Sequence, residues 1–198
     1  MSFWFDTFFP ELGERLSQLL RAPLTNPDMF WMVIPLIFIL LVMTFYFGRY
    51  IREELGWNTA VANTVVLLFV AIDLLRHIFN MTAPGSILNY QWNPLSTIIA
   101  VVVAVEAITL MFASFFKALP KQITFFLCSS LPVNLQAYIA IAIVYTAVVL
   151  DWYTLLSAAI MFVGLYLIMK FLQWVTHKLF VKVRKEHLQE KAKLKKKK

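Results

Sequence analysis

Three ionisable residues, Asp73, Arg76 and His77, lie within five positions of one another in a segment that is otherwise apolar. A carboxylate beside an imidazole can exchange protons, and the guanidinium can neutralise the carboxylate. Each ionisable group placed inside a bilayer costs at least about 2.5 kcal/mol, so such groups normally face a protein interior and have a partner there. This cluster is therefore the strongest indication of a site in the sequence.

Further polar residues extend the cluster along the same predicted helix. At 100° per residue, Asn63 and Asn80 fall on the same side of the helix as the three charged residues and form one polar stripe with them. The next apolar segment contains Glu106 near its midpoint. Because one outer loop joins the two segments, we expect them to be neighbours, with the stripe facing Glu106 across their interface.

Three interpretations of these polar residues remain open. Arg76 can pair with Asp73 and fix helix packing, or Glu106 and its neighbours can form a proton or cation path. Catalysis on a lipid or on a peptide bond, through His77 and Asp73, is the third. The sequence contains no nucleophile elbow, HExxH motif or glycine-rich phosphate loop, so we expect no enzyme, no catalytic residue, no metal and no cofactor.

The composition indicates the class of protein. Apolar residues make up 61% of the 198 residues and charged residues only 15%, and the mean hydropathy is +0.73. These values are typical of a protein whose solvent is lipid. The net charge of +7 comes from the C-terminal 21 residues, which hold ten Lys and Arg against two Glu, so it does not indicate a nucleic-acid-binding domain.

Five apolar segments are long enough to cross a hydrocarbon core of about 30 Å. They cover residues 29–48, 58–80, 95–116, 122–150 and 153–177. Lys and Arg are concentrated in the first and third connecting loops and in the C-terminal tail. The positive-inside rule then places the N-terminus outside and the C-terminus in the cytoplasm. We predict an all-α, multi-pass helix bundle in the cytoplasmic membrane or its equivalent.

Residues 1–27 precede this bundle and predict an amphipathic helix in the outer interface. Leu12, Leu16, Leu19 and Leu20 recur at helical spacing after Pro10, with charged residues between them. The predicted organisation is thus an interfacial segment (1–27), a transmembrane bundle (28–178) and a basic tail (179–198).

The fourth apolar segment is too long for one straight span and contains the polar or helix-breaking residues Pro132, Asn134 and Gln136. A proline frees the carbonyl four residues before it, which predicts a kink or a break. A broken helix could expose backbone groups to a substrate, as in transporters. We favour the plainer alternative of a short interfacial helix at 122–127, a turn, and a span that begins near Pro132.

The basic tail predicts attraction to a negatively charged surface. Its cations include Lys182, Arg184, Lys185, Lys195, Lys196, Lys197 and Lys198. Each cation near an anionic leaflet contributes about 1 kcal/mol of attraction, so anionic lipids are the expected partner. The alternative partner is ribosomal RNA, because phosphate attraction requires only a high density of lysine.

Two functions follow as hypotheses. The first is a channel or transporter subunit, assembled as a homo-oligomer or with other membrane proteins, in which the buried acids handle a proton or cation. The second is a non-enzymatic membrane subunit or assembly factor. Five spans, an outside N-terminus, the buried Arg76 and a basic C-terminus resemble the membrane insertase family in topology. The long cytoplasmic hairpin of that family is absent, so the resemblance implies at most an insertase-like role with ribosome contact through the tail.

Overall fold

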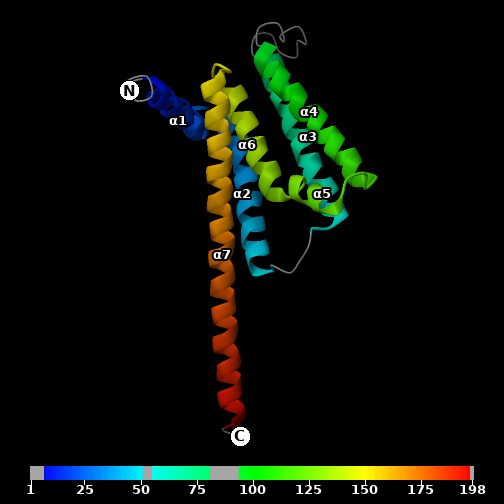
Figure 1. Ribbon diagram of the computed structural model, residues 1–198, viewed down its shortest axis with the longest axis vertical. Coiled ribbons are helices and arrows are strands. Elements are labelled where there is room, and N and C mark those ends of the chain that lie inside the picture. Colours follow the sequence, from blue (N-terminus) through cyan, green and yellow to red (C-terminus); the bar gives the residue numbers. More distant parts are fainter. Residues whose placement is uncertain (1–6, 51–54, 81–93, 197–198) are drawn as a thin grey trace.

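A computed structural model describes residues 7–50, 55–80 and 94–196, which form seven α-helices. The helices are α1 (Phe9–Thr25), α2 (Pro27–Arg49), α3 (Trp57–Asn80), α4 (Pro94–Phe115), α5 (Lys121–Leu127), α6 (Ser130–Thr146) and α7 (Trp152–Lys196). Figure 1 shows α1, α2, α6 and α7 on one side of the bundle and the hairpin of α3 and α4 on the other.

Four of these helices, α2, α3, α4 and α7, are long and apolar enough to cross a membrane. A fifth span results if α5 and α6, which are bent by 43° at their junction, count as one broken span. The multi-pass, all-helical class is therefore supported by the fold. Of the five predicted segments, 122–150 is the one that does not form a single helix, because α5 ends at Leu127 and α6 begins at Ser130.

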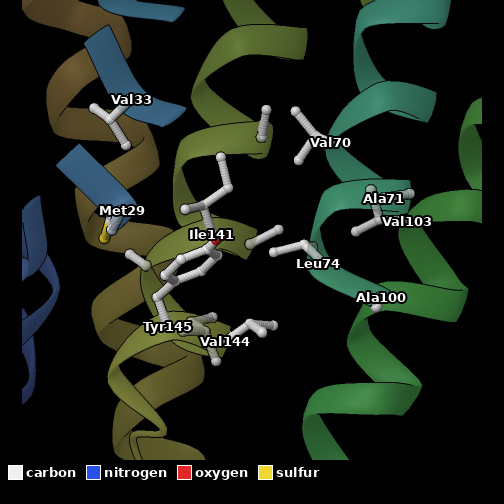
Figure 2. Close-up of a cluster of buried hydrophobic side chains, with 14 of the residues drawn as sticks. Met29, Val33, Val70, Ala71, Leu74, Ala100, Val103, Ile141, Val144 and Tyr145 are labelled. Carbon is white, nitrogen blue, oxygen red and sulfur yellow. The ribbon is translucent and has the colours of Figure 1, made fainter. Parts of the chain in front are cut away.

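Helix α6 occupies the centre of the bundle and contacts α1, α2, α3, α4, α5 and α7. Thirteen of its 17 residues are buried, which explains why its sequence is apolar on every side. In Figure 2, Ile141 and Tyr145 of α6 lie between Met29 of α2 and Leu74 of α3. The protein core is thus built around a helix of 17 residues, which is shorter than α2, α3, α4 and α7.

Helix α4 shows the opposite distribution, with a single buried stripe. This stripe consists of Ser96, Ala100, Val103, Ala107, Leu110 and Ser114. The other faces expose large apolar residues such as Val102 and Phe112, as expected where the solvent is lipid. Small residues allow close approach of helix backbones in a membrane, and α4 makes its most extensive contacts with α3.

Helix α1 packs against α2, α6 and α7. Its residues Leu19 and Ala22 are completely buried. Arg15 forms an ion pair with Asp151 at 3.2 Å, and the Ser157 hydroxyl donates a hydrogen bond to the Leu12 carbonyl oxygen at 3.1 Å. The N-terminal segment therefore forms the predicted helix and is also joined to the bundle by specific polar contacts; its position in the outer interface stays a prediction.

Helix α7 has 45 residues, or about 68 Å at 1.5 Å per residue. It extends far past the ends of the other helices (Figure 1). Near the lower end of α2 it passes so close to Gly48 that a Cβ there would lie 2.8 Å from Cβ of Thr176. The glycine of α7 itself, Gly164, has nothing within 4 Å of a Cβ built on it, so Gly48 is the glycine that this helix pair requires.

Candidate functional site

The Asp73 carboxylate on α3 is held by three hydrogen bonds. Its Oδ1 accepts from Nε and Nη2 of Arg76, at 2.9 and 2.6 Å, and its Oδ2 accepts from the Tyr145 hydroxyl at 2.7 Å. The Asp73 side chain is 11% exposed and that of Arg76 is 65% exposed. The acid therefore lies inside the bundle, while the guanidinium reaches outward from the same helix, as a long cationic side chain near a helix end does.

His77, one residue after Arg76, is stacked on Tyr145. The two ring centroids are 3.8 Å apart and the planes differ by 16°. Its Nε2 is buried and has no hydrogen-bond partner among the described residues. Tyr145 thus contacts both His77 and Asp73, and its position near the end of an apolar helix gave no sequence signal that it belongs to this cluster.

Glu106 on α4 receives a hydrogen bond from the Gln136 side-chain amide of α6. The expected contact between Glu106 and the α3 stripe is therefore replaced by two separate contacts with α6. The physical reason is the close packing of α3 and α4, whose interface is filled by small residues such as Ala100 and Ala107. The polar side chains turn instead toward the helix that lies against both.

Another member of the stripe, Asn63, lies at the junction of α5 and α6. Its side-chain amide donates to the Cys128 carbonyl oxygen at 2.7 Å, and the Ser130 hydroxyl donates to Asn63 Oδ1 at 3.4 Å. Asn63 therefore satisfies a backbone group that the junction leaves without a helical partner.

Pro132 and Asn134 belong to the first turns of α6. Proline is compatible with this position, because the first amide groups of a helix have no intrahelical acceptor. The Asn134 amide donates to the Ser130 carbonyl oxygen at 2.6 Å, while its Oδ1 is buried with no partner among the described residues. The geometry thus agrees with the short helix, the turn and the new helix near Pro132 that the sequence favours, but α5 and α6 count as a span only when they are taken together as one bent pair.

Other predicted residues are only partly described. Asn80 is the last residue of α3, and its side chain lies outside the described part of the chain. Lys182 and Arg184 are exposed on α7. The backbone of Lys185, Lys195 and Lys196 continues that helix, whereas Lys197 and Lys198 lie outside the described residues.

Within the described ranges, no group of three or more His, Cys, Asp or Glu side chains is placed to hold a metal ion. Both acids accept a hydrogen bond from a side chain of α6, Asp73 from Tyr145 and Glu106 from Gln136. Asp73 also accepts hydrogen bonds from Arg76 of its own helix. This arrangement orients both acids within the bundle; Arg76 neutralises Asp73, whereas the partner of Glu106 is a neutral amide. The long apolar helices are compatible with a multi-pass membrane protein, and the polar contacts of both acids converge on its central helix α6.

No family model, no curated protein and no solved structure matches this chain.

Proposed function

We propose that this protein is a non-enzymatic membrane subunit or assembly factor, in which the basic extension of α7 contacts a polyanionic partner such as the ribosome surface. The observation that carries the proposal is the length of α7. A membrane span needs about 20 residues, and α7 has 45, with all of its charged residues except Lys170 at position 178 or later. A rigid basic helix is suited to reach a partner outside the membrane.

The polar network supports a structural role for the buried acids. Asp73 is neutralised by Arg76 and also bonded to Tyr145. The Asp73 carboxylate is largely buried, so leaving it without its partners is costly, although the exposure of Arg76 reduces the contribution of the ion pair below that of a fully buried one. The Asp73–Arg76 pair and the bond to Tyr145 would then stabilise the helix bundle that holds α7. A catalytic role is not needed to explain these buried charges.

An orientation with the N-terminus outside and the C-terminus in the cytoplasm forms part of the proposal. Arg49 at the end of α2 lies over the Phe180 ring of α7, with 4.9 Å to the centroid. Lys117, in the turn after α4, lies 5.6 Å from the centroid of the Trp57 ring at the start of α3. These contacts support a common membrane face for the basic residues, the face from which α7 leaves the bundle.

Co-sedimentation with ribosomes tests the proposal. The purified protein in nanodiscs is compared with a variant in which Lys195 to Lys198 are all replaced by Gln, which keeps the chain length. We expect the wild type to sediment with ribosomes at physiological salt and the variant to remain in the supernatant, because phosphate attraction scales with the number of cations. Wild-type protein that fails to sediment would contradict the proposal.

Proton or cation transport is a second candidate, favoured by one observation. Glu106 lies close to the midpoint of α4, where a carboxylate is most costly, and it contacts the polar Gln136 of α6. In this hypothesis Glu106 carries the ion and Asp73 only supports the fold. Flux into proteoliposomes is then lost in Glu106→Gln and retained in Asp73→Asn, whereas equal flux in Glu106→Gln and wild type excludes transport through this acid.

A further inference from the structure

A groove of about 480 Å³ lies between α2, α5, α6 and α7. It exists because α6 begins only at Ser130 and α5 bends away from it, so no helix fills the adjoining part of the bundle. Most of the lining is aliphatic or aromatic. The polar groups in the wall come from Thr44, Ser129, Ser130, Lys170 and Gln173.

Lys170 is the charged residue of this groove. It lies about 27 Å along α7 from the start of the helix at Trp152, at 1.5 Å per residue, and therefore close to the far boundary of a hydrocarbon core of about 30 Å. Trp174, one turn further, also lines the groove and marks the interface region that tryptophan prefers. The amine thus lies at the depth of lipid headgroups, with an apolar wall extending toward the membrane interior.

The charge around the groove has one sign. No carboxylate is present among the described residues that line it. Lys178 lies over the Trp174 ring with 3.7 Å from Nζ to the centroid, and Arg49 contacts Phe180 nearby. A ligand seated here therefore meets cations at its polar end and apolar side chains along its length.

We propose that this groove binds one anionic phospholipid, with the headgroup phosphate at Lys170 and Gln173 and an acyl chain against Leu40 and Leu131. Both leucines line the groove and belong to a buried apolar cluster with Tyr166 and Met169. An anionic lipid supplies a negative charge at the interface and a hydrocarbon chain below it, which matches this division of the wall. A wholly apolar peptide segment would leave the Lys170 amine without an anion.

The site is distinct from diffuse attraction of lipids to the basic tail, and it does not depend on the proposed ribosome contact. Diffuse attraction adds about 1 kcal/mol for each cation near the surface, whichever cation it is. A seated lipid depends instead on Lys170 and on the volume of the groove. Variants of Lys170, of a cation outside the groove and of the groove volume therefore distinguish a seated lipid from diffuse attraction.

Native mass spectrometry of the detergent-solubilised full chain, titrated with phosphatidylglycerol or phosphatidylcholine, measures the binding. We expect one phosphatidylglycerol molecule to bind in preference to phosphatidylcholine. Lys170→Gln should weaken its affinity about fivefold, the equivalent of one cation at the interface. Lys170→Arg should retain binding, and Lys182→Gln, an exposed cation of the same helix outside the groove, should change it little. Excess inorganic phosphate should not displace the lipid.

A groove-filling variant, Ser129→Phe, tests the volume without altering charge. We expect Ser129→Phe to exclude the lipid. Lys170→Gln leaves the groove open, and its thermal unfolding should stay close to that of wild type. Equal weakening by Lys170→Gln and Lys182→Gln would show diffuse attraction and overturn the proposal. Equal affinity for both lipids, or complete displacement by phosphate, would overturn it as well.

Discussion

The hydroxyl of Tyr145 on α6 donates a 2.7 Å hydrogen bond to Oδ2 of Asp73 on α3, although the two residues are 72 positions apart in the chain. Two helices that are not consecutive are thereby linked at a buried point. Inside a membrane, water is not available to replace such a bond. The contact therefore fixes how α6 meets α3, and the same tyrosine ring positions His77.

Tyr145→Phe removes this donor and keeps the ring that stacks on His77. Because the acceptor is a carboxylate, we expect the free energy of unfolding to fall by about 1.5 to 3 kcal/mol. Unfolding in mild detergent, followed by circular dichroism, measures the change. Tyr138→Phe is the matched control, since the Tyr138 hydroxyl makes longer contacts of 3.3 and 3.4 Å with backbone carbonyls of α1. Equal losses in the two variants would argue against a special role for Tyr145.

Arg76→Met leaves the Asp73 carboxylate without its cation. We expect a loss of about 2 kcal/mol, less than for a fully buried pair because Arg76 is largely exposed. Asp73→Asn alone should cost less, since Tyr145 can still donate to the amide oxygen. The double variant should then be more stable than Arg76→Met. A double-mutant cycle of unfolding free energies measures this coupling, and strict additivity would contradict it.

Gly48→Ala places a methyl group against α7. With 2.8 Å to Cβ of Thr176 and 2.9 Å to the Gln173 carbonyl oxygen, the two helices must move apart, and we expect a loss of about 1 to 3 kcal/mol. Gly164→Ala is the control on α7, where nothing lies within 4 Å. There the change should be neutral or slightly stabilising, because alanine favours a helix more than glycine does. Thermal unfolding of both variants in detergent compares them.

Asn63→Leu removes the donor to the Cys128 carbonyl oxygen at a similar side-chain volume. The unsatisfied carbonyl should cost about 1 to 3 kcal/mol and loosen the junction of α5 and α6. Cys128 is the only cysteine of the chain and is buried, so its labelling by a maleimide reports this loosening. We expect faster labelling in Asn63→Leu than in wild type, and no change in Thr59→Val, a half-buried residue in the first turn of the same helix. Unchanged labelling in both variants would show that Asn63 does not secure the junction.

Asp151 gives a pH dependence outside the membrane spans. The Thr154 backbone amide, the Thr154 hydroxyl and Arg15 hold the pKa of Asp151 below its ordinary value of 3.8. A lowered carboxylate pKa stabilises the folded protein above the pKa of the unfolded chain, and this contribution is lost as pH falls through the folded-state pKa. The stability difference between wild type and Asp151→Asn should be constant above about pH 5 and shrink below about pH 4. Thermal unfolding across this range tests it, and an unchanging difference would contradict it.

The number and type of elements follow from sequence because their signals are local. Apolar length predicts α2, α3, α4 and the apolar part of α7, since a bilayer imposes one length scale on every span. Pro132 and its polar neighbours likewise predicted the interruption between α5 and α6, which depends on the chemistry of adjacent residues. The charge of the tail is also visible directly in composition.

Only the tertiary structure shows which helices contact one another. The periodicity that predicted the α3 stripe gives the direction of Asp73 and Asn63 around their own helix, but it does not identify the helix that lies on that side. Close packing of α3 and α4 through small residues excluded Glu106 from the stripe. The nearly all-apolar α6 then supplied Tyr145 and Gln136 as partners.

The sequence by itself thus determined a helical protein with several apolar segments of membrane-spanning length, an interrupted segment, a stripe of polar residues and a basic C-terminal extension. Tertiary structure alone decided that the central helix is α6, that it satisfies both acids, and that its late start leaves the groove beside Lys170. The physical reason is that span length, charge and helix breaks are encoded over a few neighbouring residues. Contacts between helices depend instead on the shapes of surfaces that come from distant parts of the chain.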